Sequence, residues 1–344
     1  MMTEREVEHL RANPRFLVRE LMRRGIDVEV FDWDNEVIEA RLGEHVELFL
    51  DIDSSRMPFS ASSIASSKSL TKRLLARAGI STPKGSRFSI ADSEAAVGYC
   101  CELGFPVVIK PSLGVQGELV HMDIESAYEA RLALQSIAEA KGEVEVIVEE
   151  QFAGEEYRVF VTQHGEFAVV HRDPASVLGD GVHTIKELAE AESHRRMNPR
   201  VNCLCPVVLD EEAERFIKKR GKRFDSIPAR GEKIYLRRSS NIKLGGFCTD
   251  YTELVHPSVI EICYRALRAI PALPYGGLDF MSTDITKEQT PEMYRILEIN
   301  SLPGIGIHCA PGAGQSRNVP GMIVDLVFPE SIPAGGRLDP GFAH

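Results

Sequence analysis

Two kinds of apolar run alternate along this 344-residue chain. Short runs rich in β-branched residues are typical of buried strands, whereas longer runs with apolar residues every three or four positions are typical of helices. The strand-like runs are 27–31, 46–50, 106–110, 144–149, 277–282 and 294–299. The helix-like runs are 15–24, 69–78, 93–103, 125–140, 210–220 and 257–268. This alternation predicts an α/β or α+β fold.

Three further segments have a recognisable local pattern. His164 and Gly165 separate two short apolar runs and predict a hairpin. The Ser-rich stretch 60–67 shows no period, so we expect a loop or linker there. The tail 331–344 is rich in Gly and Pro, and we expect it to be loose.

Charge and composition exclude several classes of protein. The chain has 51 Asp and Glu against 40 Lys and Arg, and this net charge of −11 without a long basic run predicts no nucleic-acid partner. No apolar run approaches the ~20 residues that span a bilayer, and the charged start at 3–8 lacks a signal-peptide pattern. The seven cysteines are irregularly spaced, and Cys203 and Cys205 lack a second close pair that would favour zinc. We therefore expect a cytoplasmic protein with reduced thiols and no membrane partner.

A lysine ends the apolar strand 106–110, and a loop with glycines follows it. Lys110 has a fixed origin on the strand, and Gly114 and Gly117 would let backbone N–H groups approach the same phosphate oxygens. The order of residues is not that of a Walker loop. The alternative is an ordinary solvated lysine.

Acidic and amide side chains end three other apolar strands. Glu149 and Glu156 could accept hydrogen bonds from a nucleoside, although an acidic cluster is also typical of a solvated turn. Glu298 and Asn300 are two positions apart and project from one face of a strand, and Asp279 on a neighbouring strand can face them. Such oxygen ligands suit Mg²⁺ that also binds ATP phosphates. The alternative is a polar sheet face with solvated carboxylates, which such apolar strands disfavour.

A local group of cations stands out in this acidic chain. Arg237, Arg238 and Lys243 lie with Asn241 beside the pair Gly245–Gly246. Arginine in such a place can clamp a phosphoryl group or a substrate carboxylate, or it can pair with surface acids. His308 and Cys309 are adjacent, but nucleophilic catalysis needs a spatial arrangement that sequence does not supply, and it is disfavoured here.

Together these stretches resemble the ATP-grasp superfamily over about 67–330. The nearest likeness is to the ATP-grasp modules of cyanophycin synthetase and of the bifunctional glutamate–cysteine ligase/glutathione synthetase, and D-alanine–D-alanine ligase is more distant. The motifs in question are Leu236-Arg-x-x-x-Asn-Ile-x-x-Gly-Gly246, Asp250-Tyr-Thr-Glu-Leu-Val-His-Pro257, Gly179-Asp-Gly-Val-His-Thr-Ile-Lys-Glu-Leu188, Asp225-Ser-Ile-Pro228, Glu298-Ile-Asn-Ser-Leu-Pro-Gly304 and His308-Cys-Ala-Pro311.

The resemblance implies an ATP-grasp fold with an N-terminal open α/β subdomain, a small lid subdomain and a C-terminal antiparallel-sheet subdomain. We place these subdomains at 1–85, 86–163 and 164–330, followed by the tail 331–344.

The resemblance also implies a role for each matching residue. ATP would be bound by Lys72, Lys110, Ser112, Gly114, Gln116, Gly117, Glu149, Glu150, Phe152 and Glu156. Asp279, Glu298 and Asn300 would hold two Mg²⁺ ions, with Mn²⁺ as an alternative. Lys110, Arg237 and Asn241 would act in catalysis. Substrate would contact Arg158, Arg238, Ser301, Gly304 and His308.

The chain departs from the family pattern in three places. The loop at 113–118 is less glycine-rich and more acidic than in cyanophycin synthetase. The arginine that D-alanine–D-alanine ligases carry two positions before the magnesium aspartate is Gly277 here, so Arg237 is the candidate for charge stabilisation. The flanking catalytic modules of the nearer relatives are not seen, and 1–65 match nothing recognisable.

The implied activity is ATP-dependent amide formation between an amino-acid or short, γ-glutamyl-like peptide carboxylate and an amino-acid amine. Family relatives imply a homodimer. Two alternatives stay open, namely a non-catalytic ATP-binding module on the same scaffold and another ATP-grasp reaction such as carboxylation or phosphoryl transfer.

Overall fold

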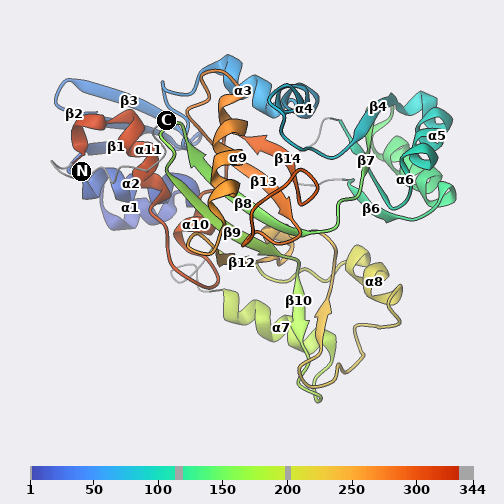
Figure 1. The fold of residues 1–344 in the computed structure, drawn as a ribbon. Helices are drawn as coiled ribbons and strands as arrows, with labels where there is room; N and C mark the ends of the chain where they lie inside the picture. The colour runs from blue at the N-terminus through green and yellow to red at the C-terminus, as the bar shows by residue number, and fades with distance from the viewer. Residues whose placement is uncertain (1, 113–118, 198–202, 333–344) are drawn as a thin grey trace.

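The computed structural model describes residues 2–112, 119–197 and 203–332 (Figure 1). Its centre is a five-stranded antiparallel sheet in the order β12-β9-β8-β13-β14. The strands are β8 (Glu155–Thr162), β9 (Phe167–Asp173), β12 (Phe247–Asp250), β13 (Tyr275–Ser282) and β14 (Tyr294–Asn300). The predicted hairpin at His164 is confirmed as β8–β9, and α9 (Pro257–Arg268) packs on the sheet. The predicted mixed α/β class with antiparallel sheets is therefore confirmed.

The N-terminal region packs against this sheet and shares its core. It contains α1 (Glu4–His9), α2 (Ala12–Arg23) and an antiparallel meander of β1 (Asp27–Asp32), β2 (Val37–Leu42) and β3 (His45–Leu50). Leu17, Ile38 and Phe49 are fully buried in the same cluster as Val159 and Phe280 of the central sheet. α11 (Val319–Val327) and η3 (Pro329–Ser331) pack beside α2 at the left of Figure 1.

The Ser-rich stretch forms a helix, so the predicted loop at 60–67 is wrong. α3 (Phe59–Ser66) buries Ala61 and Ala65, which lie four positions apart, and it packs against β14. Its apolar stripe consists of alanines, which a search for large apolar residues overlooks, and tertiary contact outweighs the modest helix propensity of serine. α4 (Lys68–Arg77) follows directly and also packs on β14.

The lid is a separate four-stranded sheet with its own core, at the right of Figure 1. Its strands β4 (Gly85–Ser89), β5 (Val107–Pro111), β6 (His121–Ile124) and β7 (Glu145–Glu150) are ordered β4-β7-β5-β6. η1 (Ile90–Asp92), α5 (Ser93–Leu103) and α6 (Ala127–Lys141) complete it. Val107 and Ile109 are fully buried, which fixes the strand that presents Lys110.

A small unit with a third core lies at the bottom of Figure 1. It contains β10 (Ser176–Leu178), α7 (Ile185–Arg196), α8 (Glu211–Lys218) and β11 (Lys233–Tyr235), and η2 (Ile242–Leu244) leads back to the central sheet. α10 (Gly306–Cys309) follows β14. Nearly all of the predicted loose tail lies outside the described residues, and the subdomain boundaries remain a prediction. Among the described residues, none of the helices has the length and apolar content needed to cross a bilayer.

Asp53, in the turn after β3, gives the folded protein a pH-dependent stability. Its Oδ1 atom is buried without a hydrogen-bond partner among the described residues. Burial and the nearby charge of Asp51 raise the pKa of Asp53 to about 6. An unfolded aspartate has a pKa of about 3.9, so the native state binds more protons between these values, and the free energy of unfolding falls as pH rises through about 4 to 6.

We therefore expect Asp53→Asn to be more stable than the wild type by about 1 kcal/mol at pH 7.5 and nearly equal to it at pH 4.5. Urea denaturation at both pH values measures the difference. Asp34→Asn, on an exposed turn, is the matched control and should leave the pH dependence unchanged. A stability gap between Asp53→Asn and wild type that is the same at both pH values would contradict this account.

Candidate functional site

One face of the central sheet has a stripe of charged side chains. Asp279 on β13 pairs in register with Arg158 on β8 and with Glu298 on β14. Glu156, on the same face of β8 as Arg158, pairs in register with Arg172 on β9. Residues in register on neighbouring strands project to the same side, so the strands bring three carboxylates and two guanidinium groups together.

Asp279 lies in the middle of this stripe and is 7% exposed. It accepts hydrogen bonds from Arg158 Nε at 2.5 Å and from Arg172 Nη1 at 3.3 Å. Burial raises the pKa of Asp279 to about 6, although both arginines lower it. The stripe is therefore an ionic network held in a largely desolvated place, where fixed charges act strongly on a bound anion.

Glu298 and Asn300 continue the stripe at its edge. Glu298 Oε2 accepts a hydrogen bond from Lys68 Nζ at 2.9 Å, and its Oε1 accepts one from Asn300 Nδ2 at 3.1 Å. Burial raises the pKa of Glu298, but Lys68 outweighs this effect and the pKa falls to about 2. The carboxylate is therefore ionised throughout the physiological range.

Helix α4 joins this stripe to the lid. Lys72 forms an ion pair with Glu149 at the end of β7, and Lys110 Nζ on β5 lies 2.7 Å from the other oxygen of the same carboxylate. Burial raises the pKa of Glu149, but the two lysines outweigh it and the pKa is lowered. Lys68 and Lys72 are four residues apart, or about 6 Å along one helix face. Helix α4 thus connects the ion pair of the predicted lid lysine Lys110 with that of the predicted metal ligand Glu298.

The predicted nucleoside contacts divide between two places. Glu150 accepts a hydrogen bond from Arg295 Nε at 2.8 Å, and the same guanidinium lies 4.7 Å from the centre of the Phe152 ring. These residues lie where the lid joins the central sheet. Glu156 lies instead in the stripe, where it accepts from Ser240 Oγ at 2.5 Å and pairs with Arg172 at 2.9 Å.

Only one of the predicted phosphate-loop residues can be placed. The Ser112 backbone N–H donates to the Glu145 carbonyl at 2.8 Å, which extends the pairing of β5 and β7. Gly114, Gln116 and Gly117 lie outside the described residues.

The predicted cations of 237–243 lie in the small unit rather than in the stripe. Arg237 is fully buried, and its Nη2 donates to the Val208 carbonyl at 2.7 Å and to Asp210 Oδ1 at 3.2 Å. Among the described residues, Arg237 Nε and Nη1 have no hydrogen-bond partner. Arg238 reaches toward the lid, 3.9 Å from Asp123. Asn241 caps η2 through its side-chain oxygen.

Ser301 and Gly304 lie in the loop after β14, and His308 lies on α10, which follows that loop. Ser301 Oγ lies 3.0 Å from Ser62 Oγ of α3, and the Gly304 position is open. His308 is 1% exposed, with its ring edge-on to Phe160, and neither ring nitrogen has a hydrogen-bond partner within the described part of the chain. Burial, and then the charge of Arg158, lower the pKa of His308 to about 3, so the imidazole is neutral.

Position 277 has no room for a side chain in this structure, which accounts for its glycine. A Cβ atom at that position would stand 2.6 Å from Pro303 Cβ and 3.1 Å from Arg158 Nη1. The guanidinium of Arg158, from the neighbouring strand, therefore fills the space above Gly277.

The sequence interpretation missed four residues of the site, namely Asn13, Lys68, Arg172 and Ser240. Lys68 was detectable, because it lies one helical turn before Lys72 on the same face. Arg172 would have followed from the strand register, because it lies opposite Glu156 of β8. Asn13 and Ser240 give no local signal, because both act through contacts distant in sequence.

Asn13 on α2 connects the N-terminal region to the loop after β14 by hydrogen bonds. Its Nδ2 donates to Asp51 Oδ1 at 2.8 Å and to the Pro303 carbonyl at 3.1 Å, and its Oδ1 accepts from the Ile305 N–H at 2.9 Å. We expect Asn13→Ala to lower kcat by about tenfold or more, because small displacements of positioned groups slow reactions strongly, while KM for ATP changes less than about twofold. Steady-state ADP release measures both constants. Asn35→Ala, at an exposed turn of the same region, is the control, and equal kcat values for the two variants would rule out this role.

The donor set of the stripe fits a magnesium ion that is shared with phosphates. Within residues 2–112, 119–197 and 203–332, no group of three or more His, Cys, Asp and Glu side chains is arranged as a complete metal site. Asp279 and Glu298 supply two carboxylates in register, and Asn300 supplies an amide oxygen. Mg²⁺ typically takes one or two protein carboxylates and completes its shell with water and substrate phosphates.

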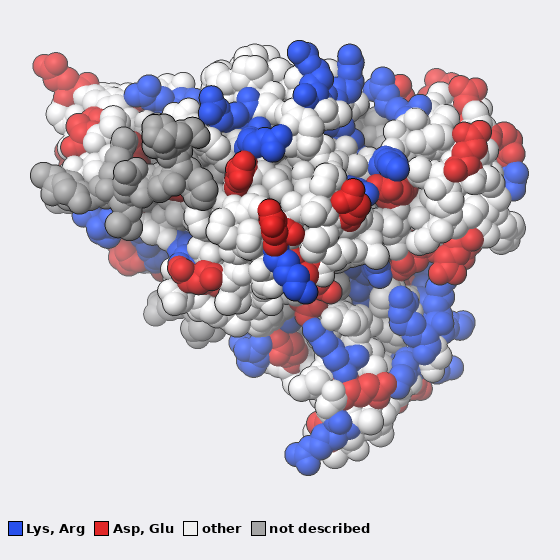
Figure 2. Space-filling model, viewed as in Figure 1, with Lys and Arg blue, Asp and Glu red and all other residues white. Residues whose placement is uncertain are grey.

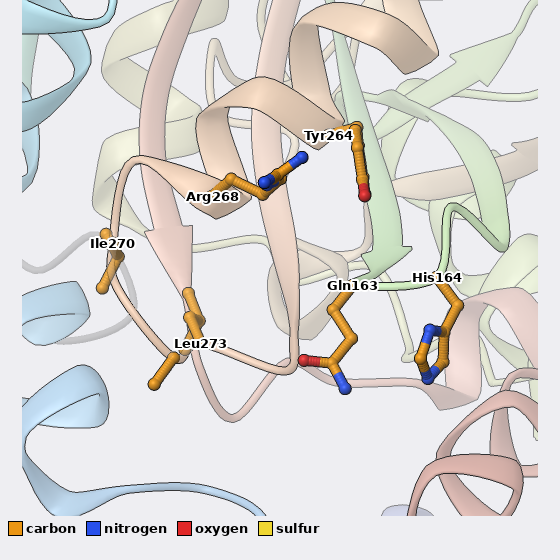
Figure 3. Close-up of a pocket in the computed structure, with 7 residues that line it drawn as sticks. Gln163, His164, Tyr264, Arg268, Ile270 and Leu273 are labelled. Atoms are coloured by element: carbon orange, nitrogen blue, oxygen red, sulfur yellow. The ribbon is translucent and has the colours of Figure 1, made fainter. Parts of the chain in front are cut away.

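A separate surface pocket lies away from these residues. It has a volume of about 490 Å³ and is formed by the β8–β9 turn, the end of α9 and the loop after it (Figure 3). Gln163, His164, Tyr264 and Arg268 line it, and none of the residues predicted for the site does. We therefore place the candidate site at the stripe and the adjoining lysines.

Curated proteins similar to this chain are ligases much longer than it. Cyanophycin synthetase of Trichormus variabilis is 34% identical over 278 residues, which are 80% of this chain and 30% of that protein. The glutathione biosynthesis bifunctional protein of Clostridium perfringens is 32% identical over 332 residues, covering 93% of this chain and 41% of that protein. The chain thus spans less than half the length of these relatives.

A family model and a solved structure agree with these likenesses. Residues 66–174 match the ATP-grasp (A) domain of phosphoribosylglycinamide synthetase. The crystal structure of a bifunctional glutathione synthetase from Pasteurella multocida superposes with a TM-score of 0.68 at 28% identity, over 92% of this chain and 44% of that one. The predicted resemblance in sequence and fold is confirmed.

Proposed function

Because the chain belongs to the ATP-grasp superfamily, we propose that it is an ATP-dependent ligase that joins a carboxylate to an amine through an acyl phosphate. The observation that carries this proposal is that two ion-paired groups adjoin through α4: Lys110 and Lys72 on Glu149, and Lys68, one helical turn from Lys72, on Glu298. This arrangement places the lysines that would bind the triphosphate of ATP beside the oxygen ligands that would bind its Mg²⁺ ion.

The lysines would bind the phosphates of ATP. Lys110 and Lys72 share Glu149, and Lys68 pairs with Glu298. A bound triphosphate would offer these cations additional negative oxygens in a site that excludes water. Glu150 and Phe152, where the lid joins the sheet, would contact the nucleoside.

Asp279, Glu298 and Asn300 would hold Mg²⁺, and we propose two ions, with Mn²⁺ able to replace them. Bound there, the metal would withdraw negative charge from the β- and γ-phosphates. Arg158 and Arg172 keep Asp279 ionised and oriented toward the same place.

The chemistry needs no side-chain nucleophile. A substrate carboxylate oxygen attacks the γ-phosphorus, the bond to the β-phosphate oxygen breaks, and ADP leaves. The amine then attacks the acyl carbon, loses a proton and expels phosphate. We propose that Arg158 in the stripe stabilises the developing charge, together with Arg237 and Asn241 if the small unit moves toward the stripe.

The substrates we propose follow the names of the relatives. They are an amino-acid or short, γ-glutamyl-like peptide carboxylate and an amino-acid amine. Ser301, Gly304, Arg238 and the neutral His308 are the candidates to contact them. We further propose that the protein acts as a cytoplasmic homodimer with neither nucleic acid nor membrane as partner.

The proposal is tested by incubating the protein with ATP, Mg²⁺ and pairs from a panel of amino acids and dipeptides. ADP release and product mass are the readouts. Amine-dependent ADP release, with a product heavier than either substrate and lighter than their sum by one water, is the expected result. Tight ATP binding without turnover on any pair would favour a non-catalytic module, and bicarbonate-dependent turnover without an amine would favour carboxylation.

A further inference from the structure

One segment of this acidic protein is strongly basic. Residues 215–243, here called the basic segment, contain eleven Lys and Arg and two acids, a net charge of +9 in a chain of net −11. Figure 2 shows these cations gathered at the bottom of the molecule and toward its lower right, over the small unit. The exposed cations are Arg215, Lys218, Lys219, Arg220, Arg223, Arg230, Lys233, Arg238 and Lys243.

The basic segment borders the candidate site. Lys219 Nζ lies 3.4 Å from Glu129 on α6, and Arg238 Nε lies 3.9 Å from Asp123 on β6, so the segment touches the lid. Ser240, near its end, donates to Glu156 in the stripe. A ligand held at the Ser240 end of the segment would therefore lie beside the stripe.

The protein neutralises only part of this charge itself. Lys222 pairs with Glu232, and Lys233 pairs with Asp173. Over the described ranges, five cations have no carboxylate partner, namely Arg215, Lys218, Arg220, Arg230 and Lys243. On α8, Glu211 and Glu214 lie four positions before Arg215 and Lys218, a spacing at which opposite charges attract. Arg220, Arg230 and Lys243 lie beyond that helix and stay available to an anionic ligand.

We infer that the basic segment binds the acidic part of an extended peptide whose reacting carboxylate enters the stripe. This inference rests on the proposed ligase function and narrows its substrate to a chain with several carboxylates. The rest of the molecule, with a net charge of −20, repels a long polyanion, so the segment suits a short acidic chain better than a nucleic acid. Complementary charge would also speed encounter with the substrate.

Binding is measured first, without turnover. Fluorescein-labelled pentaglutamate is titrated with the full chain and followed by fluorescence anisotropy, with pentaglutamine carrying the same dye as the neutral probe. The variant Lys218→Gln/Arg220→Gln/Arg230→Gln removes three charges from the segment, and Arg5→Gln/Arg87→Gln/Lys287→Gln removes three from other surfaces. We expect the first variant to weaken pentaglutamate binding about tenfold and the control less than about twofold, with binding by wild type falling as NaCl rises from 50 to 300 mM.

Turnover is measured second. If the basic segment binds the peptide, the variant Lys218→Gln/Arg220→Gln/Arg230→Gln should have a higher KM for pentaglutamate than the wild type. Its kcat and its KM for ATP should be unchanged. Equal pentaglutamate affinity in both variants, or tighter binding of a single-stranded oligonucleotide of matched charge, would overturn the inference. ADP release with neutral donors, without peptide binding that depends on the basic segment, would contradict the peptide-binding inference and leave the ligase function supported. Peptide binding that depends on the basic segment, without ADP release on any donor, would contradict the ligase function and leave peptide binding supported.

Discussion

Glu298→Gln is expected to lower kcat by at least about 1,000-fold while leaving the protein folded. The amide keeps the size of the side chain but loses the charge that a divalent cation requires. Glu298 is the proposed metal ligand that contacts a lysine of α4, since its two oxygens accept from Lys68 and Asn300. The substitution leaves Lys68 without this partner, but Lys68 is 22% exposed at its side chain, so stability should fall by only about 1 kcal/mol.

ADP release, thermal unfolding and the Mg²⁺ concentration for half-maximal rate are measured together. Glu288→Gln, an exposed acid on the loop between β13 and β14, is the matched control and should behave as wild type. A Glu298→Gln protein with full activity at the same Mg²⁺ concentration would remove the metal assignment. Loss of activity in both variants would mean that the loop between the strands, rather than the carboxylate, is responsible.

The second large effect is expected for Lys110→Gln, with kcat/KM for ATP lower by about 100-fold or more. Lys110 originates from a buried strand, which fixes the place that its ammonium group can reach. Glu149 keeps Lys72 as a partner, which limits the loss of stability that a buried unpaired carboxylate would cause. The change should therefore appear in nucleotide use rather than in folding.

Calorimetric titration with a non-hydrolysable ATP analogue, alongside steady-state kinetics, measures this effect. Lys84→Gln, an exposed lysine at the edge of the lid, is the control. Unchanged affinity for the analogue in Lys110→Gln would contradict a phosphate-binding role. A larger loss in Lys72→Gln than in Lys110→Gln would instead place the phosphates against α4.

Strand patterns predicted where the acids and the lysine of the candidate site project from their strands, and the family resemblance supplied their roles. Lys110, Glu298 and Asn300 end or interrupt apolar strands, and such a pattern fixes which face a side chain projects from. The sequence could not predict that Arg158 fills the space above Gly277, because this depends on strand order across β8 and β13. It also could not predict that Lys68 pairs with Glu298, because that contact joins α4 to β14.

Where local patterns were weak, the sequence interpretation failed. α3 buries only alanines and gives no strong periodic signal, and it forms where β14 offers it a surface to pack on. β2 does alternate Ile38, Ala40 and Leu42 with Glu39 and Arg41, but it was overlooked, and it pairs with β1 and β3. Asn13 is a related case, since its hydrogen bonds to Asp51 and to the loop at 303–305 exist only after the N-terminal region has docked.

The central claim is that a substrate carboxylate takes the γ-phosphoryl group at the stripe between Lys110 and Glu298. It is tested most directly with a carboxylate donor labelled with ¹⁸O, ATP, Mg²⁺ and amine, followed by mass analysis of the released phosphate. Attack by the carboxylate predicts one ¹⁸O atom in each phosphate molecule formed, with labelled phosphate released about 1,000-fold more slowly when Glu298→Gln replaces the wild type. Amide product formed with phosphate free of ¹⁸O would contradict it.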